Sequence, residues 1–424
     1  MERLVFGNVF VILLGTAAFG LAGCPAAACQ HPSVAGPDTV RETGQARPSI
    51  EYWDRQRIGA NWFNQVPTRE WLEAAAKANI KLVRLAFGKW KGKRRDFLLG
   101  SADNYAGLVA EDFATLERCL DIAGSLGVRI VLTPLGLPGA RNRQLNDGRP
   151  DPRLWTDPEY VPQAIEFWQD VARRLKGHPA IAAYDLINEP HPEKYHGKPT
   201  FWRQGFTEWY RKVQGTPGDL NRFNRELVAG IRRIDPDVPI VVESGLHATP
   251  WAFEYLEPLA DAGIIYSFHM YEPYEYTTRR INRGRFSYPG ETWIEDLGVR
   301  RHFDSRALAE FLDPVRSWAR RHRIPPGRIF AGEFGCDRRA KGAALYLADL
   351  VAVFNREGWH WAFYAFREDG WDAMDYELGT VRPGDRYWAA AEQRALHQHY
   401  PEIYDPLTDN TVWSVFKREL ERRR

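Results

Sequence analysis

The chain has 424 residues, of which 44% are hydrophobic and 26% are charged, a balance that fits a folded protein and excludes disorder throughout. Its 57 Lys and Arg residues against 55 Asp and Glu residues give a net charge of +2, too balanced for a protein whose main partner is nucleic acid. Aromatic residues make up 13% of the chain, including 16 Trp, which indicates either apolar platforms for sugar rings or the packed interior of a large barrel.

The first segment predicts export. Residues 4–21 are almost all apolar, and small residues follow up to Cys24, so residues 1–23 are expected to form a signal peptide. The run Leu21-Ala22-Gly23-Cys24 resembles the lipobox of bacterial lipoproteins, which implies cleavage before Cys24 and lipidation of that residue. An uncleaved membrane anchor is the alternative, because about 18 apolar residues approach the length that spans a bilayer. We therefore expect an exported protein held by a lipid anchor at the bacterial cell envelope, on the outer membrane, in the periplasm or at the cell surface.

Residues 24–50 are rich in Pro, Ala, Gly and polar residues without periodicity, which predicts a flexible linker before one catalytic domain at 51–424. The four cysteines have spacings that match no zinc site. Cys119 and Cys336 could pair in an oxidising compartment or remain buried thiols.

From residue 58 onward, short apolar strands alternate with amphipathic helices. Strands are expected at 58–62, 81–86, 128–133, 181–188, 240–243, 264–269, 329–333 and 359–366. Helices are expected at 68–78, where Thr68 is the N-cap, and at 111–126, 161–175, 220–234, 251–259, 305–322, 341–356 and 387–399, with a short tail at 400–424 that packs on the domain. Eight strands with helical crossovers predict an α/β fold, a single (β/α)8 TIM barrel. A doubly wound open sheet is the alternative, but no Gly-rich phosphate-binding sequence follows any strand.

Two carboxylates stand where barrel enzymes carry their catalytic groups, at the carboxyl ends of strands. The fourth strand ends in Asn188 and Glu189, followed by Pro190, and the seventh ends in Glu333. Retaining glycosidases need two such groups about 5–5.5 Å apart, one to protonate the leaving oxygen and one to attack the anomeric carbon. Each Glu taken singly could be a rim residue in an ion pair, whereas the pair at these two strand ends is more specific.

The chain resembles glycoside hydrolase family 5 over roughly residues 58–400. The resemblance rests on His178-Pro-Ala-Ile-Ala-Ala-Tyr-Asp-Leu-Ile-Asn-Glu-Pro190 and Ile329-Phe-Ala-Gly-Glu-Phe-Gly335. Two shorter runs support it, Lys81-Leu-Val-Arg-Leu-Ala86 and Ser267-Phe-His-Met-Tyr271.

The resemblance implies a role for each matching residue. Glu189 would be the acid/base and Glu333 the nucleophile, and Asn188 would contact the sugar 2-hydroxyl. Arg84 would hold Glu333 ionised, because a nearby cation lowers the pKa of a carboxylate. His269 and Tyr271 would orient the two carboxylates, although His269 could instead be a core histidine and Arg84 a rim ion pair.

The sequence departs from the family pattern at two places. Leu135 stands in the loop after the third strand, where many members carry a His. After the eighth strand the family has a Trp platform, and here Tyr364 aligns with it while Trp361 lies three residues earlier, so either ring is a candidate for sugar stacking. Both departures bear on the substrate more than on the reaction.

Other features have open interpretations. The loop after the second strand is basic and holds Lys89, Lys91, Lys93, Arg94 and Arg95, which suits an anionic surface or simply solvent. Trp155 and Trp202 are candidates for outer sugar platforms.

We expect a monomeric retaining β-glycosidase, similar to a cellulase or mannanase, that acts on a β-linked oligo- or polysaccharide and needs no metal or other cofactor. A surface lipoprotein that binds glycans through an inactive barrel is the alternative. A metal-dependent hydrolase is a third possibility, but such barrels usually carry paired His on an early strand, and residues 58–62 contain none.

Overall fold

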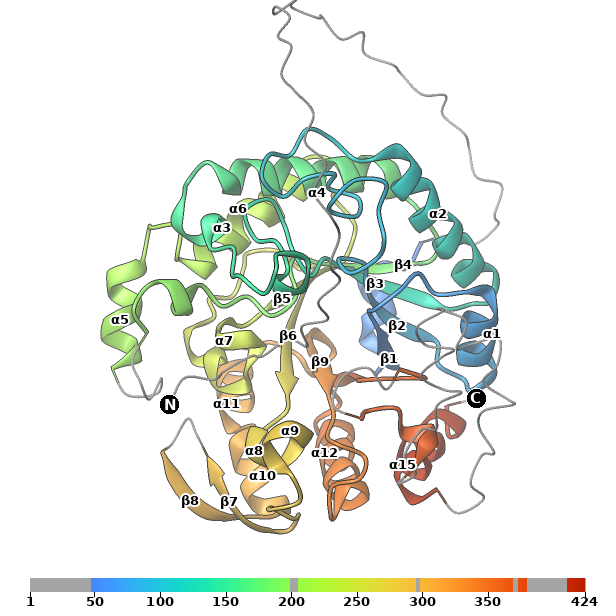
Figure 1. Ribbon diagram of the computed structural model, residues 1–424, viewed down its shortest axis with the longest axis vertical. Coiled ribbons are helices and arrows are strands. Elements are labelled where there is room, and N and C mark those ends of the chain that lie inside the picture. Colours follow the sequence, from blue (N-terminus) through green and yellow to red (C-terminus); the bar gives the residue numbers. More distant parts are fainter. Residues whose placement is uncertain (1–46, 199–204, 295–297, 369–372, 380–409, 424) are drawn as a thin grey trace, which may run out of the picture.

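Eight parallel strands close into a barrel in the computed structural model, which describes residues 47–198, 205–294, 298–368, 373–379 and 410–423 (Figure 1). The barrel strands are β1 (Ile58–Trp62), β2 (Leu82–Ala86), β3 (Arg129–Thr133), β4 (Ile181–Asp185), β5 (Ile240–Glu243), β6 (Ile264–Met270), β9 (Ile329–Phe334) and β10 (His360–Phe363). Strand β1 pairs with both β2 and β10, which closes the sheet. The expected (β/α)8 barrel is confirmed, and the open doubly wound sheet is excluded.

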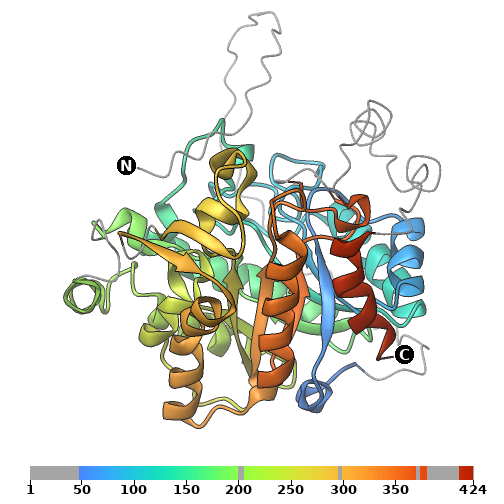
Figure 2. The same cartoon turned by 90° about the horizontal axis from the view of Figure 1, so that it is seen from below.

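Helices surround the barrel (Figures 1 and 2), and apolar side chains of the helices and strands form a common buried core. They include α1 (Arg69–Lys77), α2 (Ala110–Ser125), α4 (Tyr160–Leu175), α6 (Leu220–Arg232), α10 (Ser305–Phe311), α11 (Asp313–His322) and α12 (Ala343–Glu357). Helix α1 begins where the sequence predicts, because the Thr68 hydroxyl accepts a hydrogen bond from the backbone N–H of Trp71 at 3.2 Å. Shorter helices lie in the loops: α3 (Arg153–Thr156), α5 (Phe206–Val213), α7 (Gly245–Ala248), α8 (Tyr274–Thr277) and α9 (Arg279–Asn282).

Several elements differ from the expectation. The predicted helix at 305–322 is two helices, because Pro314 lies in the first turn of α11 and cannot continue the hydrogen bonding of α10. The predicted helix at 251–259 is a short 3-10 helix, η4 (Pro250–Tyr255). Between β6 and β9 the chain forms an unpredicted antiparallel hairpin, β7 (Gly290–Ile294) with β8 (Val299–Phe303). The helix predicted at 387–399 lies outside the described residues.

The amino-terminal end of the barrel is closed by Trp53, on the 3-10 helix η1 (Ile50–Asp54). The Trp53 side chain is fully buried among strand residues, and its indole N–H donates to the carbonyl of Ala182 at 3.2 Å. Arg47 donates to Asp235, and Pro48 is buried. Arg47, Pro48 and Ile50, the last residues of the expected linker, therefore pack on the barrel.

The end of the chain also packs on the barrel, as expected. Helix α15 (Thr411–Glu421) lies beside α12 (Figure 2), and its Phe416 ring stacks on Phe363 of β10 with centroids 4.2 Å apart. Asn410 caps this helix by accepting from the N–H of Trp413 at 2.9 Å.

Burial settles two questions for the described part of the chain. Cys119 and Cys336 are free and buried, and burial raises the pKa of the Cys119 thiol to about 12, so the disulfide alternative is wrong. Of the described tryptophans, only Trp293 and Trp413 are not buried, so most of these rings form core rather than sugar platforms.

Among the described helices, none is both long and apolar enough to cross a bilayer.

Candidate active site

Six of the residues singled out from the sequence meet at the carboxyl ends of the barrel strands. They come from different strands and from the loops that follow them, and they are Arg84, Asn188, Glu189, His269, Tyr271 and Glu333. Strand β4 ends at Asp185, earlier than predicted, so Asn188 and Glu189 lie in the loop after it. These residues are distant in the sequence, and the closure of the barrel brings them together at one rim.

Arg84 is the central cation of this cluster and is fully buried. Its guanidinium donates to Glu333 at 2.6 Å and to the side-chain oxygen of Asn188 at 3.0 Å. It also donates to Asp185 at 2.8 Å and to Glu243 at 2.6 Å. Burial opposes the charge, but the three carboxylates outweigh it and raise the pKa of Arg84. Since Arg84 occupies the Asn188 oxygen, the amide N–H groups of Asn188 remain available to a substrate hydroxyl.

The two candidate catalytic carboxylates lie close together. An oxygen of Glu189, an oxygen of Glu333 and a ring nitrogen of His269 all lie within 4.8 Å of one another. This spacing matches the short separation of a retaining pair and not the 6.5–9.5 Å separation that leaves room for water in inverting enzymes. Glu333 is almost fully buried, whereas the Glu189 side chain is 31% exposed.

Tyr271 and Arg84 hold the two oxygens of Glu333 separately. The Tyr271 hydroxyl donates to Oε2 at 2.8 Å, and Arg84 donates to Oε1. Burial raises the pKa of Glu333, and the charges of Glu189 and Glu243 add to this, although His269 and Arg84 oppose it. The expectation that Arg84 lowers this pKa is right for the sign of its own effect, but burial prevails. Burial and Glu333 also raise the pKa of Tyr271, so its hydroxyl stays a donor.

His269 lies between the carboxylates and is not a passive core histidine. Its Nδ1 is 3.0 Å from Glu189 Oε1, and its Nε2 is 3.0 Å from Glu243 Oε1. Burial disfavours the charged ring, but Glu243 and Glu333 outweigh it and raise the pKa of His269 to about 10. A β-bulge after Phe268 brings His269 opposite Glu333, and Gly332 leaves no room for a side chain, since a Cβ there would lie 2.5 Å from Ser267 Oγ and 3.3 Å from His269 Nε2.

The most important residue that the sequence analysis missed is Glu243, at the end of β5. It is buried and contacts Arg84, His269 and the backbone N–H of Glu189, which donates to it at 2.6 Å. Glu189 has a φ of +51°, a strained value for a residue other than glycine, and this hydrogen bond helps to hold it. His269 and Arg84 outweigh the effect of burial and lower the pKa of Glu243 to about 2. The rule that finds Glu189 and Glu333, a carboxylate at a strand end, would also have found Glu243.

We predict that Glu243→Gln lowers kcat with little change in KM, because the substitution keeps the side-chain volume but removes the charge that faces His269 and Arg84. Loss of a hydrogen bond to a charged group costs about 1.5–3 kcal/mol, which corresponds to roughly 10- to 100-fold in rate. NMR titration of His269 should show its pKa fall below the value in the unaltered protein. Asp185→Asn is the matched control, since Asp185 contacts Arg84 at 2.8 Å through Nε. An equal fall in the His269 pKa in both variants would contradict this role of Glu243.

Tyr364 follows β10 directly and lies beside Tyr271 of the catalytic cluster. It is buried, with 3% of its surface exposed, and its stacking on a sugar stays a prediction. Its hydroxyl donates to Glu368 at 3.1 Å, and its ring packs against Phe63 with centroids 5.2 Å apart. Glu368 is buried, which raises its pKa to about 7. Lys89 also lies here: it donates to Asn64 at 3.1 Å, and burial lowers its pKa although Glu368, Glu333 and Glu189 oppose this. Neither Glu368 nor Lys89 was assigned to the site from the sequence.

The prediction that Trp361 could stack on a sugar is wrong. Its ring is fully buried on the outer side of β10, where its indole N–H donates to Asn355 of α12 at 3.1 Å. Phe334 and Phe416 lie against it, with centroids 5.8 and 6.3 Å away. Side chains alternate across a strand, so a residue three positions before Tyr364 points to the other face.

We predict that Trp361→Ala lowers the free energy of unfolding by about 3–5 kcal/mol, the usual cost of removing a large buried ring. The KM for a soluble glucan should stay the same, since the ring does not face the site. Urea unfolding and steady-state kinetics measure the two effects. Tyr364→Ala is the comparison and should raise KM; a raised KM in Trp361→Ala instead would restore Trp361 as a substrate contact.

The remaining candidates fall as follows. Leu135 is half-buried and lies against Gly88, so the position expected for His carries an apolar side chain. Trp155 is buried against Phe223, with ring centroids 4.9 Å apart, and is not a sugar platform. Lys91, Lys93, Arg94 and Arg95 are exposed, in agreement with a solvated loop. Trp202 and Cys24 lie outside the described residues.

The donor set is a poor metal site although Glu189, His269 and Glu333 lie close enough together for one. A ligating His must be neutral at the coordinating nitrogen, whereas the raised pKa of His269, about 10, keeps the ring protonated at neutral pH. Both oxygens of Glu333 already accept hydrogen bonds. Arg84 and His269 thus supply the positive charge at this site.

The amino-acid sequence is similar to those of known proteins. Residues 42–370 match the family model described as cellulase (glycosyl hydrolase family 5). Endoglucanase C of Acetivibrio thermocellus is 23% identical over 348 residues, which cover 74% of this chain and 87% of that protein. Cellodextrinase A of Ruminococcus flavefaciens is 23% identical over 305 residues, covering 70% and 80%.

The fold is also similar to that of solved structures. The endoglucanase Cel5A from Thermotoga maritima superposes with a TM-score of 0.57 at 18% identity, covering 83% of this chain and 99% of that one. The family model spans most of the chain, and the relatives named above are enzymes of the cellulase type. The protein is therefore a glycoside hydrolase of the cellulase type, and it belongs to glycoside hydrolase family 5.

Proposed function

We propose that this glycoside hydrolase cleaves a β-linked glucan by double displacement with retention of configuration, with Glu333 as nucleophile and Glu189 as acid/base. The observation that carries the proposal is the proximity of the two carboxylates, since one oxygen of Glu189 lies within 4.8 Å of one oxygen of Glu333. Relatives named as an endoglucanase and a cellodextrinase support a β-glucan as substrate.

In the first step, Glu333 attacks the anomeric carbon and the glycosidic C–O bond breaks. Arg84 and Tyr271 each donate to one Glu333 oxygen, which fixes the orientation of the carboxylate for attack. The proton of Glu189 passes to the departing oxygen, so the leaving sugar departs as an alcohol. Since Oε1 of Glu189 faces His269 at 3.0 Å, Oε2 is the oxygen that carries this proton.

In the second step, the Glu189 carboxylate takes a proton from water, and the water oxygen attacks the anomeric carbon of the glycosyl-enzyme. The bond to Glu333 breaks, and the product keeps its original configuration. Asn188 would donate to the sugar 2-hydroxyl, since Arg84 orients its oxygen away from the substrate.

The test is sugar release by the purified protein from carboxymethyl cellulose, β-1,3-glucan, mannan, xylan and glycosylceramide. Glu189→Gln and Glu333→Gln serve as matched variants, because they keep the side-chain size and remove the charge. We expect release from a β-glucan, loss of release in both variants, and no effect of EDTA. Tight glycan binding without release by the unaltered protein would support the non-catalytic alternative instead.

We also propose that the protein is exported and anchored to the bacterial cell envelope by a lipid on Cys24, on the strength of the apolar segment and the lipobox-like run before that residue. Metabolic labelling with an alkyne fatty acid should mark the unaltered protein and not Cys24→Ser. Equal labelling of both, or labelling of neither, would contradict the anchor.

A further inference from the structure

The loops that follow β4 and β5 meet beside the acid/base and place two histidine rings face to face. His191 lies two residues after Glu189, and His247 lies in α7, after β5. Their ring centroids are 4.2 Å apart and their planes differ by 18°. The sequence analysis singled out neither residue, and the proposed chemistry uses neither.

The His191 ring of the pair is held in one orientation and one charge state. His191 Nδ1 lies 2.8 Å from the carbonyl of Glu189, which can only accept, so Nδ1 carries the proton. Burial lowers the pKa of His191, so the ring is neutral at neutral pH. A neutral, fixed imidazole presents a flat face, and the ring is held by the Glu189 carbonyl at Nδ1 and by the Tyr195 hydroxyl, 3.4 Å from Nε2.

The His247 ring is carried by a strained segment of backbone. Leu246, His247 and Ala248 have φ values of 55°, 62° and 58°, in the left-handed region that residues other than glycine rarely adopt. Three successive strained residues persist only where their surroundings enforce them, and such strain concentrates at functional sites.

Several contacts enforce that conformation. The His247 N–H donates to the Pro190 carbonyl at 3.2 Å, which ties the loop directly to the residue after Glu189. The Leu246 N–H donates to the buried carboxylate of Glu193 at 3.2 Å. Gly245 allows this approach, since a Cβ there would lie 2.2 Å from Glu193 Oε1.

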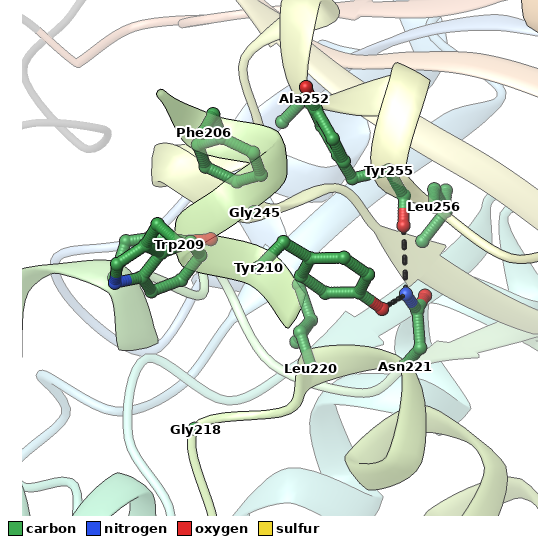
Figure 3. A pocket seen from close by; sticks show the side chains of 11 residues that line it. Phe206, Trp209, Tyr210, Gly218, Leu220, Asn221, Gly245, Ala252, Tyr255 and Leu256 are labelled. Atoms are coloured by element: carbon green, nitrogen blue, oxygen red, sulfur yellow. Dashed lines mark hydrogen bonds between the residues drawn. The ribbon is translucent and has the colours of Figure 1, made fainter. Parts of the chain in front are cut away.

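The far side of this loop rests on packed aromatic residues. Gly245 and Glu193 line a small hollow, partly open to solvent, together with Phe206, Trp209, Tyr210 and Tyr255 (Figure 3). Asn221 closes one side of it by hydrogen bonds to Tyr210 and to the Tyr255 carbonyl. One face of the loop thus contacts these packed residues, while His247 on the loop is exposed.

The chemistry of the proposed function gives this pair a location relative to the substrate. The acid/base protonates the oxygen of the leaving group, so the leaving group lies on the Glu189 side of the bond that breaks. The His pair lies on that side, attached to the chain at Glu189 and Pro190. Tyr364 follows β10, which lies on the opposite side of the barrel from β4.

The geometry points to the stacked pair His191–His247 as a binding platform for the leaving-group sugar, and equally for a sugar acceptor that replaces water in the second step. The inference rests on the proposed function and assigns the ligand class: a pyranose whose apolar face packs on an imidazole ring. The strained loop after β5 supports the exposed ring of this platform.

The test compares two variants that differ in whether a flat ring remains at position 247. His247→Asn removes the ring but suits a left-handed conformation, and His247→Phe keeps a flat ring. The purified protein and both variants are given 2,4-dinitrophenyl β-cellobioside as donor and cellobiose as acceptor. The measured quantity is the ratio of transfer product to hydrolysis product, which is set by how well the acceptor binds to the glycosyl-enzyme.

We expect His247→Asn to lower this ratio roughly 2- to 10-fold, the range for loss of one ring-stacking contact, and His247→Phe to keep it near the value of the unaltered protein. Thermal unfolding of the variants checks that both fold. Normal release of dinitrophenol with an unchanged ratio in His247→Asn would overturn the platform alone. Absence of dinitrophenol release by the unaltered protein would contradict the proposed function, and the platform with it.

Discussion

Replacing Glu333 by alanine is expected to lower kcat on the order of 10⁴-fold or more, the size of effect seen when an enzyme loses its covalent nucleophile. No other described carboxylate can take its place, because Glu243 is directed toward Arg84, His269 and the backbone of Glu189. Glu189 remains as acid, but it has no covalent partner. Steady-state kinetics on carboxymethyl cellulose would measure the loss.

Chemical rescue makes this prediction specific to the nucleophile. Azide is small enough to occupy the space that the Glu333 side chain leaves, and it would attack the activated donor 2,4-dinitrophenyl β-cellobioside directly. The product should be the α-glycosyl azide, with inverted configuration, identified by its anomeric NMR signal. Glu310→Ala, on the exposed face of α10, is the control and should behave like the unaltered protein. A β-glycosyl azide from Glu333→Ala would show that the two carboxylates have the opposite roles.

Replacing Glu189 by alanine should have an effect that depends on the leaving group. With an oligosaccharide, whose departing oxygen needs a proton, we expect a loss of about 10²- to 10⁴-fold, the usual contribution of general acid catalysis. With a dinitrophenyl glycoside, which departs without a proton, formation of the glycosyl-enzyme should stay fast and its hydrolysis should become slow. Burst kinetics would measure both phases.

Azide also separates the two roles in this variant. It should attack the accumulated glycosyl-enzyme and release the β-glycosyl azide, because two inversions restore the original configuration. The Glu189 side chain is 31% exposed, so its removal leaves an opening through which azide can enter. An equal loss of activity on both kinds of substrate, without a burst, would contradict the assignment of Glu189 as acid/base.

The network behind these two residues explains why several charges can be buried together. Asp185, Glu243 and Glu333 surround Arg84, and His269 adds a second positive charge between Glu243 and Glu189. Arg84 donates a hydrogen bond to each of the three carboxylates, which offsets the cost of their burial, whereas removal of one partner leaves an uncompensated charge. This is why single substitutions here are expected to change the pKa values of neighbouring groups as well as the rate.

The order of elements and the positions of the two carboxylates could be predicted from the sequence because both are local properties. Apolar runs of strand length alternate with amphipathic helices, and Glu189 and Glu333 follow such runs directly. The parallel crossover rule then brings all carboxyl ends of the strands to one rim. Thr68, which caps α1, was predictable for the same reason.

Other features depend on contacts between residues distant in the sequence, and no local pattern carries them. Glu243 ends a strand as Glu189 and Glu333 do, but its function lies in what it contacts, residues 54, 159 and 26 positions away on three other segments. Trp361 was misplaced because its position relative to Tyr364 depends on which face of β10 points inward. The stacked histidines come from two loops 56 residues apart.

The sequence by itself determined the barrel, the family and the two carboxylates at the strand ends, because strand periodicity, strand-end carboxylates and short motifs are properties of consecutive residues. The tertiary structure alone decided how the charges combine: that burial raises the pKa of Glu333 against the pull of Arg84, and that two carboxylates keep His269 protonated. The physical reason is that the free energy of a buried charge depends on every neighbour within a few ångströms, and those neighbours are set by the closing of the barrel.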